Sequence, residues 1–148
     1  MSTQIPWAPG AKWVHITCRL GQPKPDGADP DEYPELVTMG GRVTITCSIP
    51  QARYDEADGR RRMLNLKGPW NYSIRPEDGE LYNAESGIVG VNILSSLTEG
   101  LDPSGFTWAA NVQPDEGDPF SVVIPAMEGV FDLVDAIDTP SVPPQLIS

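Results

Sequence analysis

The chain contains a single histidine, His15, which is the first candidate for acid–base chemistry. A histidine base needs a nucleophile and an orienting acid within hydrogen-bond reach. No residue close to His15 in the sequence supplies that pair, and the chain lacks the Gly-x-Ser-x-Gly turn that presents a nucleophilic serine. We therefore expect His15 to be a surface residue in the middle of a strand, and we expect no catalytic residue and no enzymatic activity.

Two cysteines, Cys18 and Cys47, raise the questions of a metal site and of a disulfide. Metal sites usually need three or four ligands, and only one histidine is present to help the two thiols. If the two cysteine strands form a simple antiparallel hairpin, Cys18 lies nearer Val43 and Cys47 nearer Val14, so the sulfurs do not meet. A shifted register would bring them closer. We expect two buried free thiols, since cysteine is among the most buried residue types, and no metal or other cofactor.

Two acidic segments, residues 26–32 and 115–118, hold carboxylates close together. Neither has the Asp-x-Asp-x-Asp-Gly spacing that wraps a chain around one calcium ion, so we expect solvated loops. The one basic cluster is residues 60–62, and in a strand Arg60 and Arg62 would share a face. These arginines either pair with the acidic loops or form a docking patch for an acidic neighbour, because charge complementarity sets the register of interfaces.

The overall composition excludes several classes of protein. The 148 residues suit one domain, and 21 acidic against 10 basic side chains give a net charge of −11. This charge disfavours binding to nucleic acid or to an anionic membrane surface, both of which need a basic face. The first ten residues lack the basic and apolar parts of a signal peptide, and no apolar run approaches the ~20 residues of a membrane span. We expect synthesis in a cytoplasm and no membrane insertion.

The pattern of apolar residues predicts an all-β protein. With 14 glycines and 16 prolines the chain is rich in turns, which favours β-structure over a helical bundle. Apolar and polar residues alternate in the predicted strands, which are residues 12–20, 42–49, 60–66, 70–74, 87–94, 106–112 and 120–125. Residues 21–41 are predicted to be a long loop with a short edge strand at 36–37, residues 50–59 a polar connection, and residues 129–135 one helical turn.

We therefore predict an antiparallel β-sandwich of about seven strands, immunoglobulin-like or transthyretin-like, over residues 12–137. Extended Pro-rich arms at residues 1–11 and 138–148 would flank this domain. Trp70, Tyr72 and Trp108 lie in alternating strands, so we expect most of them in the core. The predicted inner face consists of Val14, Ile16, Val43, Ile45, Val89, Val91, Phe106, Trp108, Val122 and Ile124.

Several motifs in the second half occur in a recognisable order. A Pro-x-Gly-aromatic-Thr-aromatic strand at 103–108 precedes an acidic hairpin, a Phe-x-Val-x-Ile-Pro strand at 120–125 and an Asp-Leu turn at 132–133. With the Gly-x-Val-Thr-x-Thr strand at 41–46, this arrangement resembles minor tail proteins of tailed phages that infect Actinobacteria. Ile45 stands where those proteins usually have an aromatic residue.

This resemblance implies a structural virion protein, a β-sandwich domain of the tail tip or attached fibres that takes part in host attachment. It implies a symmetric homo-oligomer, other phage tail proteins as partners, and a location in the virion tail after synthesis in the host cytoplasm. The candidate assembly contacts are Trp7, Arg60, Arg62, Pro143, Pro144, Leu146 and Ile147. Here the two prolines would pre-set an extended backbone and the last two residues would offer apolar side chains to a neighbour.

Two other functions remain open from the sequence. The main alternative is a module that binds carbohydrate or protein on the host surface, with tryptophans and tyrosines as a stacking platform. An exposed pair of coplanar aromatic side chains would favour it. An enzyme is the third, and it would need a cleft in which His15 meets a carboxylate and a hydroxyl.

Overall fold

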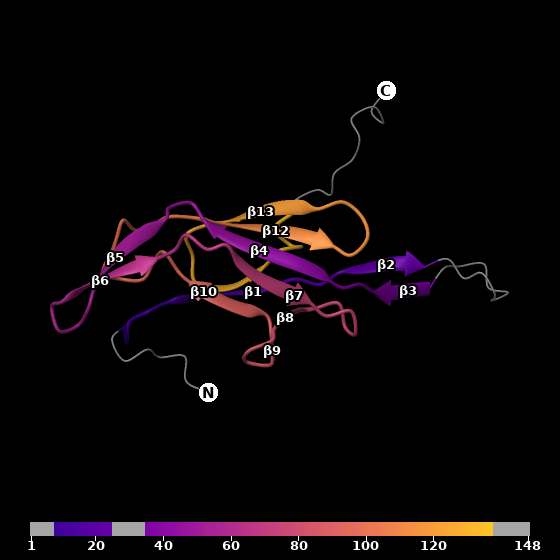
Figure 1. Ribbon diagram of the computed structural model, residues 1–148, viewed down its shortest axis with the longest axis horizontal. Coiled ribbons are helices and arrows are strands. Elements are labelled where there is room, and N and C mark those ends of the chain that lie inside the picture. The colour runs from indigo at the N-terminus through magenta and orange to yellow at the C-terminus, as the bar shows by residue number, and fades with distance from the viewer. Residues whose placement is uncertain (1–7, 25–34, 138–148) are drawn as a thin grey trace, which may run out of the picture.

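The computed structural model of the chain describes residues 8–24 and 35–137. These residues contain fourteen short strands and no helix (Figure 1). The strands are β1 (Trp13–Thr17), β2 (Gly21–Lys24), β3 (Glu35–Thr38), β4 (Gly41–Cys47), β5 (Gln51–Asp55), β6 (Arg61–Asn65), β7 (Trp70–Ile74), β8 (Leu81–Asn83), β9 (Ile88–Val89), β10 (Val91–Leu94), β11 (Leu101–Asp102), β12 (Trp108–Pro114), β13 (Phe120–Ile124) and β14 (Gly129–Asp132).

The strands form four sheets, and nearly all neighbouring strands are antiparallel. The largest sheet has the order β13-β12-β4-β7-β8-β9, and a second has the order β10-β1-β14. A third sheet has the order β11-β5-β6, and β2 pairs with β3 alone. The all-β class is confirmed, but the strands are more numerous than predicted. One pair departs from the antiparallel prediction, because β1 and β14 run parallel.

One hydrophobic core joins buried side chains of the six-stranded sheet to those of the β10-β1-β14 sheet. Nine of the ten residues predicted for the inner face are buried in it. The exception is Val89, which is 39% exposed. The reason is Gly90, whose φ of 83° divides the predicted strand 87–94 into β9 and β10 and interrupts the alternation of faces. Ala8, from the expected N-terminal arm, also belongs to this core.

Three segments differ from the sequence prediction. Residues 51–55, predicted as a polar connection, form β5 and pair with β6. The predicted loop 21–41 contains the β2–β3 hairpin, in which the expected edge strand at 36–37 is confirmed as part of β3. Residues 129–132, predicted as helical, extend along β1 because that strand offers hydrogen-bonding groups on its free side.

The molecule is elongated, with the β5–β6 hairpin at one end and the β2–β3 hairpin at the other (Figure 1). Two turns gather at the β2–β3 end. The Thr38 hydroxyl donates a hydrogen bond to the Pro76 carbonyl (2.6 Å), and the Asp115 amide donates one to the Gly40 carbonyl (3.0 Å). The turn between β7 and β8 and the loop between β12 and β13 therefore lie together beside the start of β4.

Candidate functional site

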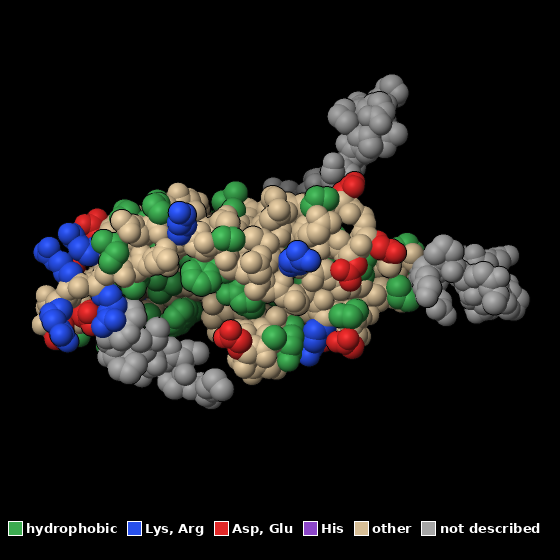
Figure 2. Space-filling view, in the orientation of Figure 1, with side chains coloured by type: hydrophobic (Ala, Val, Ile, Leu, Met, Phe, Trp, Pro, Cys, Tyr) green, Lys and Arg blue, Asp and Glu red, His purple; other side chains and the backbone are tan. Residues whose placement is uncertain are grey.

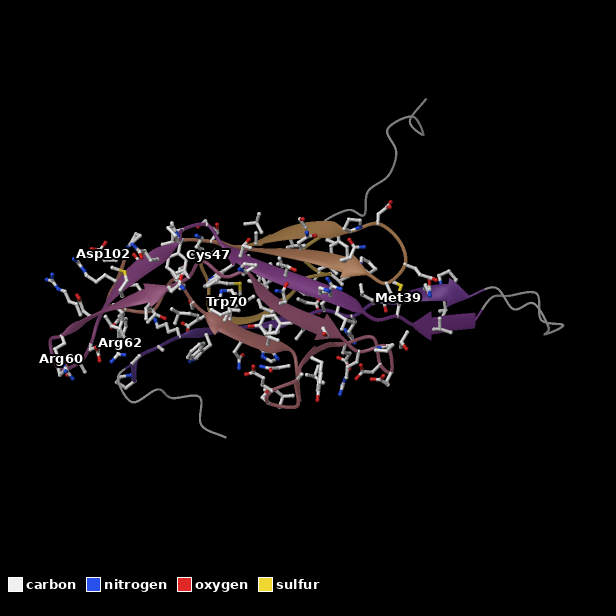
Figure 3. The ribbon with its side chains drawn as sticks, viewed as in Figure 1. Met39, Cys47, Arg60, Arg62, Trp70 and Asp102 are labelled. Atoms are coloured by element: carbon white, nitrogen blue, oxygen red, sulfur yellow. The ribbon has the colours of Figure 1, made fainter. Side chains whose placement is uncertain are left out.

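The basic cluster lies on the β5–β6 hairpin, and Figure 3 shows Arg60 and Arg62 at its end. Arg60 Nε is 2.8 Å from Asp58 Oδ2, and Arg62 Nε is 3.2 Å from Glu56 Oε2. The Arg60 backbone amide, and then its side chain, hold the pKa of Asp58 below its usual value. The observed acidic partners thus come from the hairpin itself, and not from the two acidic segments that the sequence singled out.

The hairpin nevertheless differs in charge from the rest of the chain. Residues 51–67 carry five basic and three acidic side chains, whereas the whole chain has a net charge of −11. Two further pairs are Arg61 with Asp55 (3.7 Å) and Arg53 with Asp102 of β11 (2.8 Å). The pairs of Arg53, Arg60 and Arg61 are exposed, and such pairs contribute only about 0–1 kcal/mol each, so these arginines can exchange partners at little cost. The Arg62–Glu56 pair differs, because the Glu56 side chain is only 8% exposed.

The opposite end of the molecule is acidic. Residues 113–119 carry three carboxylates and no basic side chain, and residues 75–80 carry three carboxylates and one arginine. The segment that joins β2 to β3, residues 25–34, contains four carboxylates in the sequence and lies outside the described residues. Figure 2 shows Lys and Arg side chains gathered over the β5–β6 end, while Asp and Glu are the more frequent at the other end. The molecule is therefore electrically polarised along its long axis.

A groove of about 400 Å³ opens beside β7, away from both ends. It is lined by Trp70, Asn71, Tyr72, Ser73, Tyr82, Asn83, Ala84 and Glu85. The groove exists because β8 pairs with β7 only at Ser73 and Ile74. Among the described residues, no strand continues this pairing along the first three residues of β7, and the chain turns away after Asn83.

Trp70 forms the rim of this groove and is 42% exposed, so its predicted place in the core is wrong. Its indole lies close over Gly68, where an added Cβ would be 2.9 Å from the ring atoms Cδ1 and Nε1. Gly68 also has a φ of 59°, which other residues rarely adopt. Tyr72, the other aromatic predicted to be internal, is half-buried. A glycine two residues before an aromatic residue at a strand start was the available sequence signal.

Charged side chains lie near both tyrosines of the groove. The guanidinium of Arg75 stacks over the Tyr82 ring, 4.3 Å from its centroid, and Arg75 is itself paired with Asp78. Burial raises the pKa of Tyr72, and the nearby carboxylate of Glu85 raises it further. Tyr72 therefore keeps its phenolic proton at neutral pH, when its hydroxyl can both donate and accept a hydrogen bond.

A second cavity, of about 410 Å³, is also lined by Trp70 and is mainly apolar. It is lined by Ala8, Ala11, Trp13, Tyr54, Leu64, Asn65, Leu66, Trp70, Leu94 and Thr98. Trp70 thus lines both a groove of mixed polar and apolar character and a mainly apolar cavity. Two cavities of different chemistry that share one exposed tryptophan make this the most distinctive concave region among the described residues.

The single histidine contacts an asparagine, and the two cysteines are free thiols. His15 Nδ1 lies 2.9 Å from the amide oxygen of Asn92, across the β1–β10 pair. Both cysteines are free, as predicted, although Cys47 is only half-buried. They do not lie on a shared hairpin, because β1 pairs with β10 and β14 while β4 pairs with β12 and β7. Burial, followed by the charge of Asp132, raises the pKa of Cys18 to about 12.

Residues 8–24 and 35–137 hold no group of three or more His, Cys, Asp or Glu side chains placed to bind a metal ion. They also contain no helix long and apolar enough to cross a membrane. Five of the predicted assembly contacts lie outside the described part of the chain, namely Trp7, Pro143, Pro144, Leu146 and Ile147.

Comparison with known proteins gave no relative: no family model, no curated protein and no solved structure matches this chain.

Proposed function

We propose that this chain is a structural subunit of a phage tail, in the tail tip or its attached fibres, and that it acts by non-catalytic protein–protein assembly. The resemblance of residues 41–135 to minor tail proteins supports this proposal. The observation that carries it is the charge polarity of the subunit, with a basic hairpin at one end and acidic turns at the other. Its partners would be further copies of this chain and other tail proteins.

Opposite charges at the two ends of one subunit favour a head-to-tail contact. Such contacts are heterologous, and they close into a symmetric ring when the rotation between copies divides a full turn. Charge complementarity mainly guides the approach and the register of the partners. Arg60 and Arg61 would exchange their weak local carboxylates for those of residues 75–80 and 113–119 on the next copy, and Arg62 would add its positive charge beside them.

A sandwich fold is part of the same proposal. The six-stranded sheet and the β10-β1-β14 sheet share one core, which supports an immunoglobulin-like or transthyretin-like sandwich. In this arrangement, Pro143 and Pro144 would present Leu146 and Ile147 to a neighbouring subunit, and Trp7 would do the same from the other terminus.

Charge reversal on the hairpin tests the head-to-tail contact. In sedimentation velocity at about 50 mM salt, the wild-type chain should associate, and about 500 mM salt should reverse the association by screening. Arg60→Glu with Arg62→Glu should weaken association at low salt by about tenfold or more. The double variant places two carboxylates where the acidic end of the next copy would approach.

A matched control separates this contact from net charge. Arg19→Glu with Arg42→Glu alters the net charge equally, from −11 to −15, since each substitution changes it by two. Both arginines are exposed and lie toward the acidic end, where the backbone of Arg19 forms an isolated β-bridge with Glu80 and Arg42 lies opposite Ser73 in the β4–β7 pair. This control should keep or strengthen association. Equal weakening by both variants, or a wild-type monomer at every concentration, would contradict the contact.

A further inference from the structure

The groove beside Trp70 has a chemistry of its own that the assembly contact does not use. We propose that it binds a neutral glycan, with the indole of Trp70 as the platform on which a sugar ring stacks. The inference does not depend on the tail assignment or on the charged ends. Figure 3 shows Trp70 near the middle of the molecule, far from Arg60 and Arg62, so both surfaces can be occupied at once.

The apolar surface offered to a sugar ring is the indole of Trp70. The C–H groups of a sugar ring pack against an aromatic face, and a large rigid ring provides contact area at a low cost in conformational entropy. Trp70 is 42% exposed, and its indole already lies close over Gly68 in the absence of a ligand. The volume of about 400 Å³ lies within the ~300–1,000 Å³ of small-molecule sites.

The polar part consists of amides beside a single carboxylate. The Asn71 side-chain oxygen receives the Thr44 hydroxyl, and the Asn83 oxygen receives the backbone amides of Glu85 and Ser86. Within the described residues this leaves the amide NH₂ groups of both asparagines to donate. The exposed carboxylate of Glu85 accepts. Vicinal hydroxyls both donate and accept, so they match this mixture of groups.

The charge of the lining selects among glycans. The groove is lined by one carboxylate and by no lysine or arginine. A sialylated, sulfated or phosphorylated ligand would therefore meet repulsion without a compensating cation. The guanidinium of Arg75 is held over Tyr82, a lining residue, and against Asp78. A glycan without acidic groups fits this lining.

A peptide strand fits the groove less well. Strand addition requires a run of unpaired backbone, and here the unpaired edge of β7 covers only its first three residues. The turn that follows Asn83 closes the end of this run, where the Asn83 carbonyl accepts the Gly87 amide. A compact ring is a better match for this short, closed groove than an extended chain.

The test uses the full chain on an array of neutral hexose and pentose oligosaccharides, with acidic oligosaccharides and a peptide library beside them. The best neutral ligand is then titrated by calorimetry against variants. Trp70→Ala should weaken binding by at least about tenfold, and Gly68→Ala should weaken it by displacing the indole. Met63→Ala, an exposed apolar side chain on β6, should bind as wild type does.

Two further measurements make the outcome decisive. The ligand should shift tryptophan fluorescence in the wild type and not in Trp70→Phe. The Arg60→Glu with Arg62→Glu variant should bind the glycan normally, so failure of assembly and failure of this site are distinguishable. The proposal is overturned if no neutral oligosaccharide binds at millimolar concentration, if binding survives in a folded Trp70→Ala protein, or if only acidic oligosaccharides or peptides depend on Trp70.

Discussion

Replacing Trp108 with alanine is expected to lower the free energy of unfolding by about 3–5 kcal/mol, as is typical when a large buried aromatic residue is removed from a core. Trp108 is 4% exposed on β12, in the middle of the shared core. Its Nε1 donates a hydrogen bond to the Leu94 carbonyl of β10 (3.0 Å), so the side chain links the two sheets. Phe106 packs edge-on against its ring, with 5.9 Å between centroids.

Urea denaturation followed by circular dichroism measures this loss, and Trp70→Ala is the matched control. The same residue type is removed there, but Trp70 is 42% exposed where Trp108 is 4% exposed, so the loss should be clearly smaller, roughly three-fifths as large. Equal losses at the two positions would mean that Trp108 does not join the sheets in the way described.

Replacing Gly79 with alanine should cost about 3 kcal/mol, for two additive reasons. Gly79 has a φ of 69°, where an ordinary residue pays about 1–2 kcal/mol. In addition, an added Cβ would stand 2.3 Å from the Leu20 carbonyl oxygen, which belongs to the backbone and cannot rotate away. The backbone must shift, which weakens the hydrogen bond from the Leu20 amide to the Gly79 carbonyl (2.8 Å).

Gly59→Ala isolates the first of these reasons. Gly59 has a similar φ of 87°, but nothing lies within 4 Å of its added Cβ. Thermal and urea unfolding should therefore show a loss of about 1–2 kcal/mol at Gly59 and a clearly larger one at Gly79. If the two variants lose the same stability, the close approach of the β7–β8 turn to Leu20 is wrong.

The core was predictable because its signal is local. Val14 and Ile16, like Val43 and Ile45, alternate with polar residues, and a period of two indicates which face of a strand is buried. The same rule applied to residues 51–55, where Ala52 and Tyr54 are buried and their neighbours are not. That strand was missed because a small alanine and three polar residues resemble a connection.

The remaining errors concern features that depend on distant parts of the chain. Residues 129–132 are a strand only because β1 lies beside them, and nothing in their own sequence records that pairing. The exposure of Trp70 depends on β8 leaving β7 after Ser73, which is a matter of register between strands. The groove beside Trp70 is therefore visible in the structure and not in the sequence.

The central claim, that this chain is a structural subunit of a phage tail, is tested most directly on particles of a phage that encodes it. Quantitative mass spectrometry gives its copy number, and a cryo-electron microscopy map of the same tails gives its place. We expect a fixed number of symmetric copies, with each β5–β6 hairpin against the acidic end of the next copy or of another tail protein. Infectious particles whose tails lack the chain would contradict the claim.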